Sequence, residues 1–123
     1  MKAWIGKALM VIAVLHIIVG VTAYGPTLKA LLDAGIVNTI TISEHPDRGA
    51  AFWFLVSGFA FLVIGSLVDY LEKSELKIPL FVGISVAILT AIGITMMPVS
   101  GFWLLILPLA GLARMATMKK AGS

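Results

Sequence analysis

The sequence contains no cysteine and very few charged residues. Of its 123 residues only 12% are Asp, Glu, Lys or Arg, whereas 60% are hydrophobic. Without cysteine there is no disulfide framework, no thiolate metal site and no thiol nucleophile. Because so few charges cannot cover a water-facing surface, the composition excludes an ordinary soluble domain.

The net charge of +3 does not indicate a nucleic-acid partner. The basic residues lie at the ends of apolar runs, and they form no basic stripe with interleaved aromatic residues. We therefore expect no nucleic acid among the partners and attribute the basic residues to membrane topology.

Four apolar stretches predict membrane spans, since about 20 residues in a helix cross a ~30 Å hydrocarbon core. They cover residues 4–24, 50–70, 79–97 and 101–117. The last is short and contains Pro108, which we expect to kink the helix. A re-entrant segment is the alternative there. The predicted fold class is all-α, an integral membrane four-helix bundle that forms a single domain over residues 1–123.

The basic residues also predict the orientation, because positive charges near span ends stay in the cytoplasm. Only Lys29 and Arg48 lie on the outer side in the four-span arrangement. The other seven lie on the opposite side: Lys2, Lys7, Lys73, Lys77, Arg114, Lys119 and Lys120. The prediction is a multi-pass protein of the cell inner membrane with cytoplasmic amino and carboxyl termini.

The long loop from residue 25 to 49 is predicted to have structure of its own. Residues 26–35 begin with proline and end with glycine, which is typical of a short interfacial helix. Residues 36–42 are β-branched and extended in character. Residues 43–48 are the only dense polar cluster of the chain.

Small residues at regular spacing predict which helix faces pack, because membrane helices approach closely where glycine and alanine align. Three stripes predict a compact, left-handed bundle: Gly6, Ala13 and Gly20; Ala51, Gly58 and Gly65; and Gly83, Ala87, Ala91 and Thr95. The acidic residues near helix ends are interpreted as plain surface charges: Asp33, Asp69, Glu72 and Glu75.

His16 is an ionisable residue inside a predicted span, where such groups are costly. It shares the face of Ala13 and Gly20, so we expect it to point into the bundle. It is interpreted either as a neutral imidazole bonded to a neighbouring helix or as a group for proton transfer or ligand contact. Haem or metal ligation is the third alternative; we predict no metal site, because the other histidine lies in a loop.

The polar cluster of the outer loop predicts a ligand site at the outer mouth of the bundle. A carboxylate, an imidazole and a guanidinium there would orient a polar head above an apolar interior. The candidate ligand-binding residues are His16, Tyr24, Glu44, His45, Arg48, Trp53, Ser57, Ser100 and Trp103. The alternative is a solvated loop in which Asp47 or Glu44 caps the following helix and Arg48 contacts lipid phosphate.

Several motifs resemble a family of uncharacterised small bacterial membrane proteins with four spans. They are the Trp4-Ile5-Gly6 start, the span around His16, Arg48-Gly49-Ala50-Ala51-Phe52-Trp53-Phe54 with Gly58, and Pro98-Val99-Ser100-Gly101-Phe102-Trp103. The layout is also similar to that of DoxX-type proteins and, more distantly, of the emopamil-binding group. Those resemblances are at the level of fold alone, and they imply a sterol-like or quinone-like ligand between the helices.

Three functions from different classes remain open. The first is binding of a lipidic small molecule in the outer half of the bundle. The second is a membrane enzyme that uses His16 or His45 with Glu44 as acid and base on an apolar substrate. The third is a structural subunit of a membrane complex. The sequence requires no cofactor, and the partners considered are membrane lipids, an apolar small molecule and a second copy of the chain.

Overall fold

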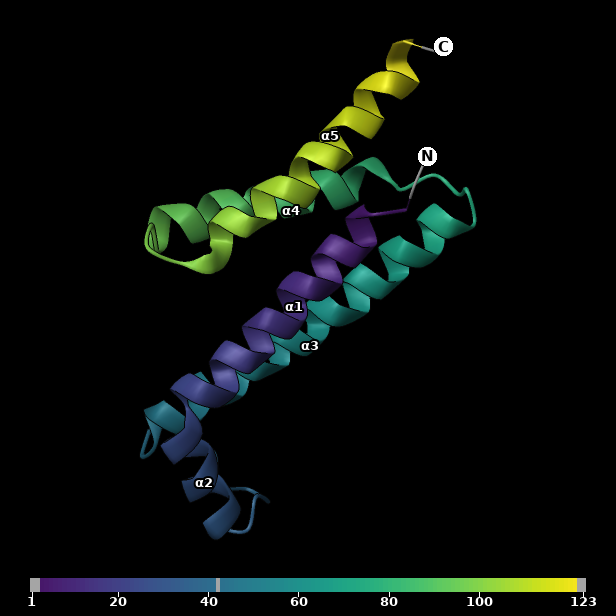
Figure 1. Ribbon diagram of the computed structural model, residues 1–123. Helices are drawn as coiled ribbons and strands as arrows, with labels where there is room; N and C mark the ends of the chain where they lie inside the picture. Colours follow the sequence, from purple (N-terminus) through teal and green to yellow (C-terminus); the bar gives the residue numbers. More distant parts are fainter. Residues whose placement is uncertain (1–2, 42, 122–123) are drawn as a thin grey trace.

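The computed structural model describes residues 3–41 and 43–121, and its regular structure there is entirely helical (Figure 1). The helices are α1 (Ile5–Ala23), α2 (Gly25–Asp33), α3 (Pro46–Lys73), α4 (Leu80–Met96), the 3₁₀ helix η1 (Gly101–Leu105) and α5 (Ile106–Ala121). The predicted all-α class is confirmed, and so is the short helix in the long loop. Residues 36–41, expected to be extended, form no strand; Ile36 and Asn38 have positive φ angles of 68° and 54°.

Three helical segments are long and apolar enough to cross a membrane. They are Ile5–Ala23, Pro46–Lys73 and the combined η1–α5 segment Gly101–Met118. α4 is apolar but shorter, with 17 residues. At 1.5 Å per residue it is about 26 Å long, close to the thickness of a hydrocarbon core.

The four long helices associate as two pairs, α1 with α3 and α4 with α5 (Figure 1). α1 joins the pairs, because it also contacts α5 and η1. Among the described helices, α3 contacts neither α4 nor α5. In Figure 1 the pairs meet near the start of α1 and separate toward α2. The bundle is therefore two helical hairpins joined at one end, which is less compact than the small-residue stripes predict.

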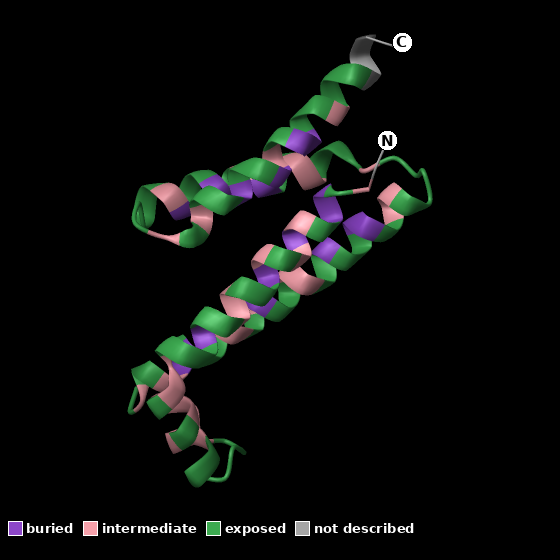
Figure 2. Ribbon diagram, viewed as in Figure 1, coloured by how far each residue is buried: buried purple, intermediate pink, exposed green. Residues whose placement is uncertain are grey.

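The seam between α1 and α3 is formed by the predicted small residues. Gly6, Ala13 and Gly20 are buried on α1, facing the buried Ala51, Gly58 and Gly65 of α3 (Figure 2). A Cβ added to Gly20 would lie 2.7 Å from Leu55 Cδ2, and one added to Gly58 would lie 2.7 Å from Ile17 Cγ1. The stripes on these two helices are confirmed.

The stripe predicted on α4 is wrong. Ala91 and Thr95 are exposed, whereas Val86, Thr90 and Gly93 are buried. A stripe with a repeat of four residues drifts by about 40° per step around a helix of 3.6 residues per turn. A face that packs over several turns must therefore alternate steps of three and four, as the buried residues of α4 do.

The structural role of Pro108 differs from the helix kink that its position in the sequence predicts. It is buried as the third residue of α5, where a missing backbone N–H removes no intrahelical hydrogen bond. The chain before it is the 3₁₀ helix η1, and the Ile106 N–H is directed to the carbonyls of Trp103 and Leu104. The proline ring excludes an α-helical bond to the Leu104 carbonyl, so the helix changes type at this point.

Candidate functional site

His16 joins α1 to α3 through its imidazole. The Nε2 atom lies 2.8 Å from the carbonyl oxygen of Phe54, to which it donates, and 3.1 Å from Ser57 Oγ. The ring also stacks on Phe54, with centroids 4.0 Å apart and planes 10° apart. Gly58 leaves the space for it, because a Cβ there would lie 3.0 Å from His16 Cδ2. These contacts match the interpretation of His16 as a bonded group between helices.

Tyr24 belongs to the same cluster. Its ring lies against the Phe54 ring at a centroid distance of 5.5 Å. Tyr24 directly follows the last residue of α1, the helix that carries His16. The structure therefore brings His16, Tyr24 and Ser57 together around Phe54, the first two at its ring and Ser57 at its backbone carbonyl. In the part of the chain that is described, no group of three His, Asp or Glu residues is arranged to hold a metal ion.

The polar residues of the long loop bond mainly to the loop itself. Arg48 Nη1 donates to the Thr39 carbonyl at 3.0 Å, and Thr41 Oγ1 donates to Glu44 Oε2 at 3.4 Å. His45 is the residue before α3, and no side chain caps this helix. The capping role considered for Glu44 or Asp47 is thus not observed, although Asp47 lies in the first turn of α3.

Ser100 and Trp103 lie on the other helical hairpin. Ser100 Oγ donates to the Met97 carbonyl at 2.6 Å, and Trp103 Nε1 donates to the Pro98 carbonyl at 2.8 Å. The η1 helix that carries Trp103 contacts α1, α4 and α5 and makes no contact with α3, which carries the exposed Trp53. The predicted residues therefore form separate groups. Ser100 and Trp103 lie apart because the two hairpins diverge, and the loop residues bond within the loop rather than to the His16 cluster.

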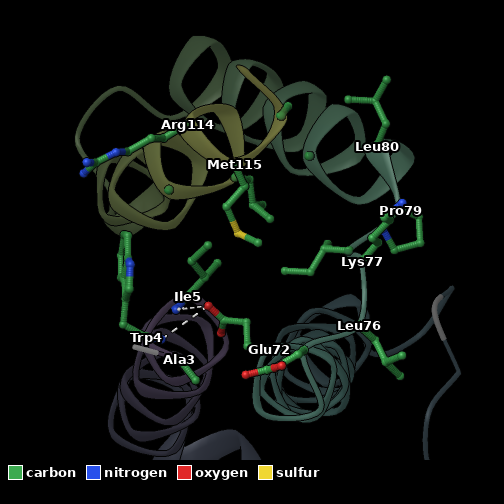
Figure 3. Close-up of a pocket in the computed structure, with 16 residues that line it drawn as sticks. Ala3, Trp4, Ile5, Glu72, Leu76, Lys77, Pro79, Leu80, Arg114 and Met115 are labelled. Carbon is green, nitrogen blue, oxygen red and sulfur yellow. Dashed lines mark hydrogen bonds between the residues drawn. The ribbon is translucent and has the colours of Figure 1, made fainter. Parts of the chain in front are cut away.

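A partly open cavity of about 540 Å³ lies where the ends of four helices meet (Figure 3). It is bounded by the starts of α1 and α4 and by the ends of α3 and α5. Apolar side chains, among them Ile5, Leu112 and Met115, form much of its lining, and the Met115 sulfur points toward its centre. The lining also contains four charged residues: Glu72, Glu75, Lys77 and Arg114. None of the predicted site residues borders this cavity.

Glu72 binds the start of α1 from the end of α3. Its carboxylate accepts hydrogen bonds from the backbone N–H groups of Trp4 and Ile5 at 3.3 and 3.2 Å (Figure 3), and from that of Gly6 at 2.8 Å. The first N–H groups of a helix have no intrahelical partner and favour a negative charge. The interpretation of Glu72 as a plain surface charge is wrong. The sequence indicates that α1 needs an acceptor from elsewhere in the chain. Residues 1–4 include no Ser, Thr, Asp or Asn that could cap this helix.

Asp69 was also expected at the surface and is buried instead, with 8% of its area exposed. It pairs with Lys73, one turn further along α3, and its second oxygen has no partner among the described residues. Gly6 packs directly on the Asp69 backbone. Since any side chain at position 6 would collide with that backbone, Gly6 and Asp69 set the distance between α1 and α3 at this end.

A second hollow, an open groove of about 620 Å³, lies between α1 and the η1–α5 segment. It extends from Lys7 past Val11 and Leu15 on α1 and reaches Trp103 on η1. Its other lining residues are aliphatic, and no Asp or Glu borders it. Trp103 is the one predicted site residue that lines it.

The long apolar helices, with their charged residues gathered near helix ends, define a helical membrane protein. The chain belongs to the family described as a family of unknown function (DUF6463), whose model matches residues 1–119. The resemblance to an uncharacterised family is thereby confirmed. No curated protein and no solved structure matches the chain.

Proposed function

We propose that this chain binds a lipidic small molecule, quinone-like or sterol-like in character, between its helices. The proposal places it in a bacterial inner membrane with four spans, a DoxX-like layout and cytoplasmic termini. The observation that supports it best is the partly open cavity of about 540 Å³. Its volume and its mixed lining, largely apolar with a few charged groups, are typical of small-molecule sites.

The location of the cavity moves the proposed site away from the outer loop. In the proposed orientation the cavity lies at the cytoplasmic end, where Lys7, Lys73 and Lys77 are found. The groups from which the outer site was inferred bond to their own loop or lie on separate hairpins. The proposed class of ligand is the same as the one inferred from the sequence. The proposed binding site lies in the inner half of the protein.

The cavity lining suggests how an amphiphile would be held. Its apolar part would contact Ile5, Leu112 and Met115, and methionine adapts readily to an irregular ligand surface. Its polar head would lie near Lys77 and Glu75 at the turn between α3 and α4. Glu72 already accepts three backbone hydrogen bonds, so we assign it to holding this wall of the cavity rather than to ligand contact.

The enzyme hypothesis has less support from the contacts. His16 bonds to Phe54 and Ser57, and neither His16 nor His45 borders the cavity. If no bound molecule is found by experiment, the structural-subunit hypothesis is favoured.

Substitution of Met115 tests the site. Met115→Trp would fill the cavity, and Met118→Trp offers a matched control because Met118 lies one turn further along α5 and is 48% exposed. We expect native mass spectrometry and lipid extraction to find an apolar molecule with the wild type and with Met118→Trp, and much less with Met115→Trp. Melting temperatures measured in parallel identify a variant that has lost ligand only because it has unfolded.

Two results would overturn the proposal. One is retention of the same molecule by a folded Met115→Trp variant at the wild-type level. The other is purification of the wild type from a gentle detergent with no apolar molecule bound. The second result would favour the structural subunit.

A further inference from the structure

The groove between α1 and α5 is formed by two matched stripes of side chains. One stripe is Trp4, directly before α1, with Ala8, Val11 and Leu15 of α1; the other is Trp103 of η1 with Leu107, Ala110 and Arg114 of α5. Both follow steps of four, three and four residues, which keep one face of a helix over three turns. Ala8, Val11, Leu15, Trp103, Leu107 and Ala110 line the groove.

Both stripes carry alanine near the Lys7 end of the groove, which leaves space there. Ala8 and Ala110 replace the larger side chains that would otherwise fill the space between the helices. Closer to the start of α1 the gap is closed by the Trp4 indole, since a Cβ added to Gly111 would lie 2.5 Å from Trp4 Cζ2. The groove therefore begins one turn beyond Trp4 and is distinct from the cavity of about 540 Å³.

The length of the groove fits one membrane leaflet. Lys7 and Leu15 both line it, and eight residues of α-helix extend about 12 Å. Half of a ~30 Å hydrocarbon core is about 15 Å. The apolar surface between Lys7 and Trp103 thus matches an acyl chain of the leaflet that contains the start of α1.

The charged residue that lines the groove and the one that ends its α5 stripe are both basic. Lys7 lines the groove, and Arg114 ends the α5 stripe, with its guanidinium directed away from the centre of the other cavity (Figure 3). Both residues are exposed, and neither forms an ion pair within residues 3–41 and 43–121. A lysine near a helix end extends its ammonium toward the interface, the side on which Arg114 lies, three residues beyond the Gly111 that packs on Trp4.

We propose that the groove is a binding site for an anionic phospholipid. One acyl chain lies along Ala8 and Ala110 toward Trp103, and the phosphate lies between Lys7 and Arg114. The occupant is a phospholipid of the surrounding leaflet, because the groove is open along its side and has no acidic residue that would repel a phosphate. This site shares Arg114 with the lining of the proposed small-molecule site, but the proposal does not depend on that site.

Native mass spectrometry with defined lipids tests the proposal. The purified protein is incubated with phosphatidylglycerol or phosphatidylethanolamine of identical acyl chains, and the bound fraction of each is measured. We expect the wild type to prefer phosphatidylglycerol and the double variant Lys7→Gln/Arg114→Gln to lose that preference by a factor on the order of ten. Lys29→Gln, at the opposite end of the protein in the proposed topology, is the charge control and should retain it.

A second pair of variants tests the groove itself. Ala110→Leu fills it, whereas Ala60→Leu adds the same volume to an exposed alanine of α3. We expect Ala110→Leu to weaken binding of both lipids at an unchanged melting temperature, and Ala60→Leu to leave binding unchanged. Equal effects of the two leucine variants, or an unchanged preference in the double variant, would overturn the proposal. Loss of the apolar molecule from Met115→Trp with intact phosphatidylglycerol preference would show that the two sites are independent.

Discussion

The Glu72 carboxylate accepts a hydrogen bond from the Gly6 backbone N–H at 2.8 Å, across a separation of 66 residues in the sequence. Two more N–H groups of the same turn are bound by this carboxylate. α1 has no side-chain cap at its first residues and no acidic residue in its first turn. The end of α3 therefore supplies the negative charge that the start of α1 lacks.

The first prediction concerns this cap. Glu72→Ala should lower the free energy of unfolding in detergent by about 1–2 kcal/mol, because three N–H groups lose their acceptor. Glu75→Ala is the control, since Glu75 is exposed and lies just beyond the helix end. Thermal melting of both variants measures the difference, and equal melting temperatures would show that water replaces the carboxylate without loss.

The second prediction compares two glycines. Gly6→Ala should destabilise the protein by about 1–3 kcal/mol, because the added methyl group meets the Asp69 backbone and the helices must separate. Gly83→Ala should be tolerated, since its Cβ would lie at an ordinary contact distance of 3.7 Å from Leu112 Cβ. Melting curves of the two variants check this order. Similar stability for both would mean that α1 and α3 pack less closely at this end than described.

The third prediction assigns His16 to helix packing. His16→Phe preserves the stack on Phe54 but removes the Nε2 donor, so stability should fall by about 0.5–1.5 kcal/mol. Ser57→Ala should affect the same interaction, and the double variant should lose less than the sum of the single losses. If His16→Phe instead retains full stability and changes the molecule that co-purifies, His16 contacts a ligand.

The fourth prediction concerns the membrane orientation. A periplasmic reporter fused after Ser123 should be inactive, whereas one inserted near Asn38 in the long loop should be active. The reason is the seven-to-two division of basic residues between the two sides. An active reporter at Ser123 or an inactive one at Asn38 would contradict the four-span topology.

The helices themselves were predictable from the sequence because their determinants are local. In a bilayer the backbone N–H and C=O groups must bond within the segment, so a long apolar run becomes a helix whatever its partners are. The short helix α2 was likewise predictable from a proline at its start and a glycine beyond its end. The seam of α1 and α3 followed from a seven-residue repeat, which nearly matches two helical turns.

The positions of the sites were decided by the tertiary structure alone. Whether Ser100 and Trp103 meet Arg48 depends on how two hairpins diverge, and a pattern along one helix contains no such information. The roles of Glu72 and Asp69 depend on contacts with Gly6, more than 60 residues away in the sequence. Composition and periodicity determine that the chain is helical and apolar. Long-range packing determines where a cavity is left and which charges border it, because small differences in side-chain volume at helix crossings set the angle between whole helices.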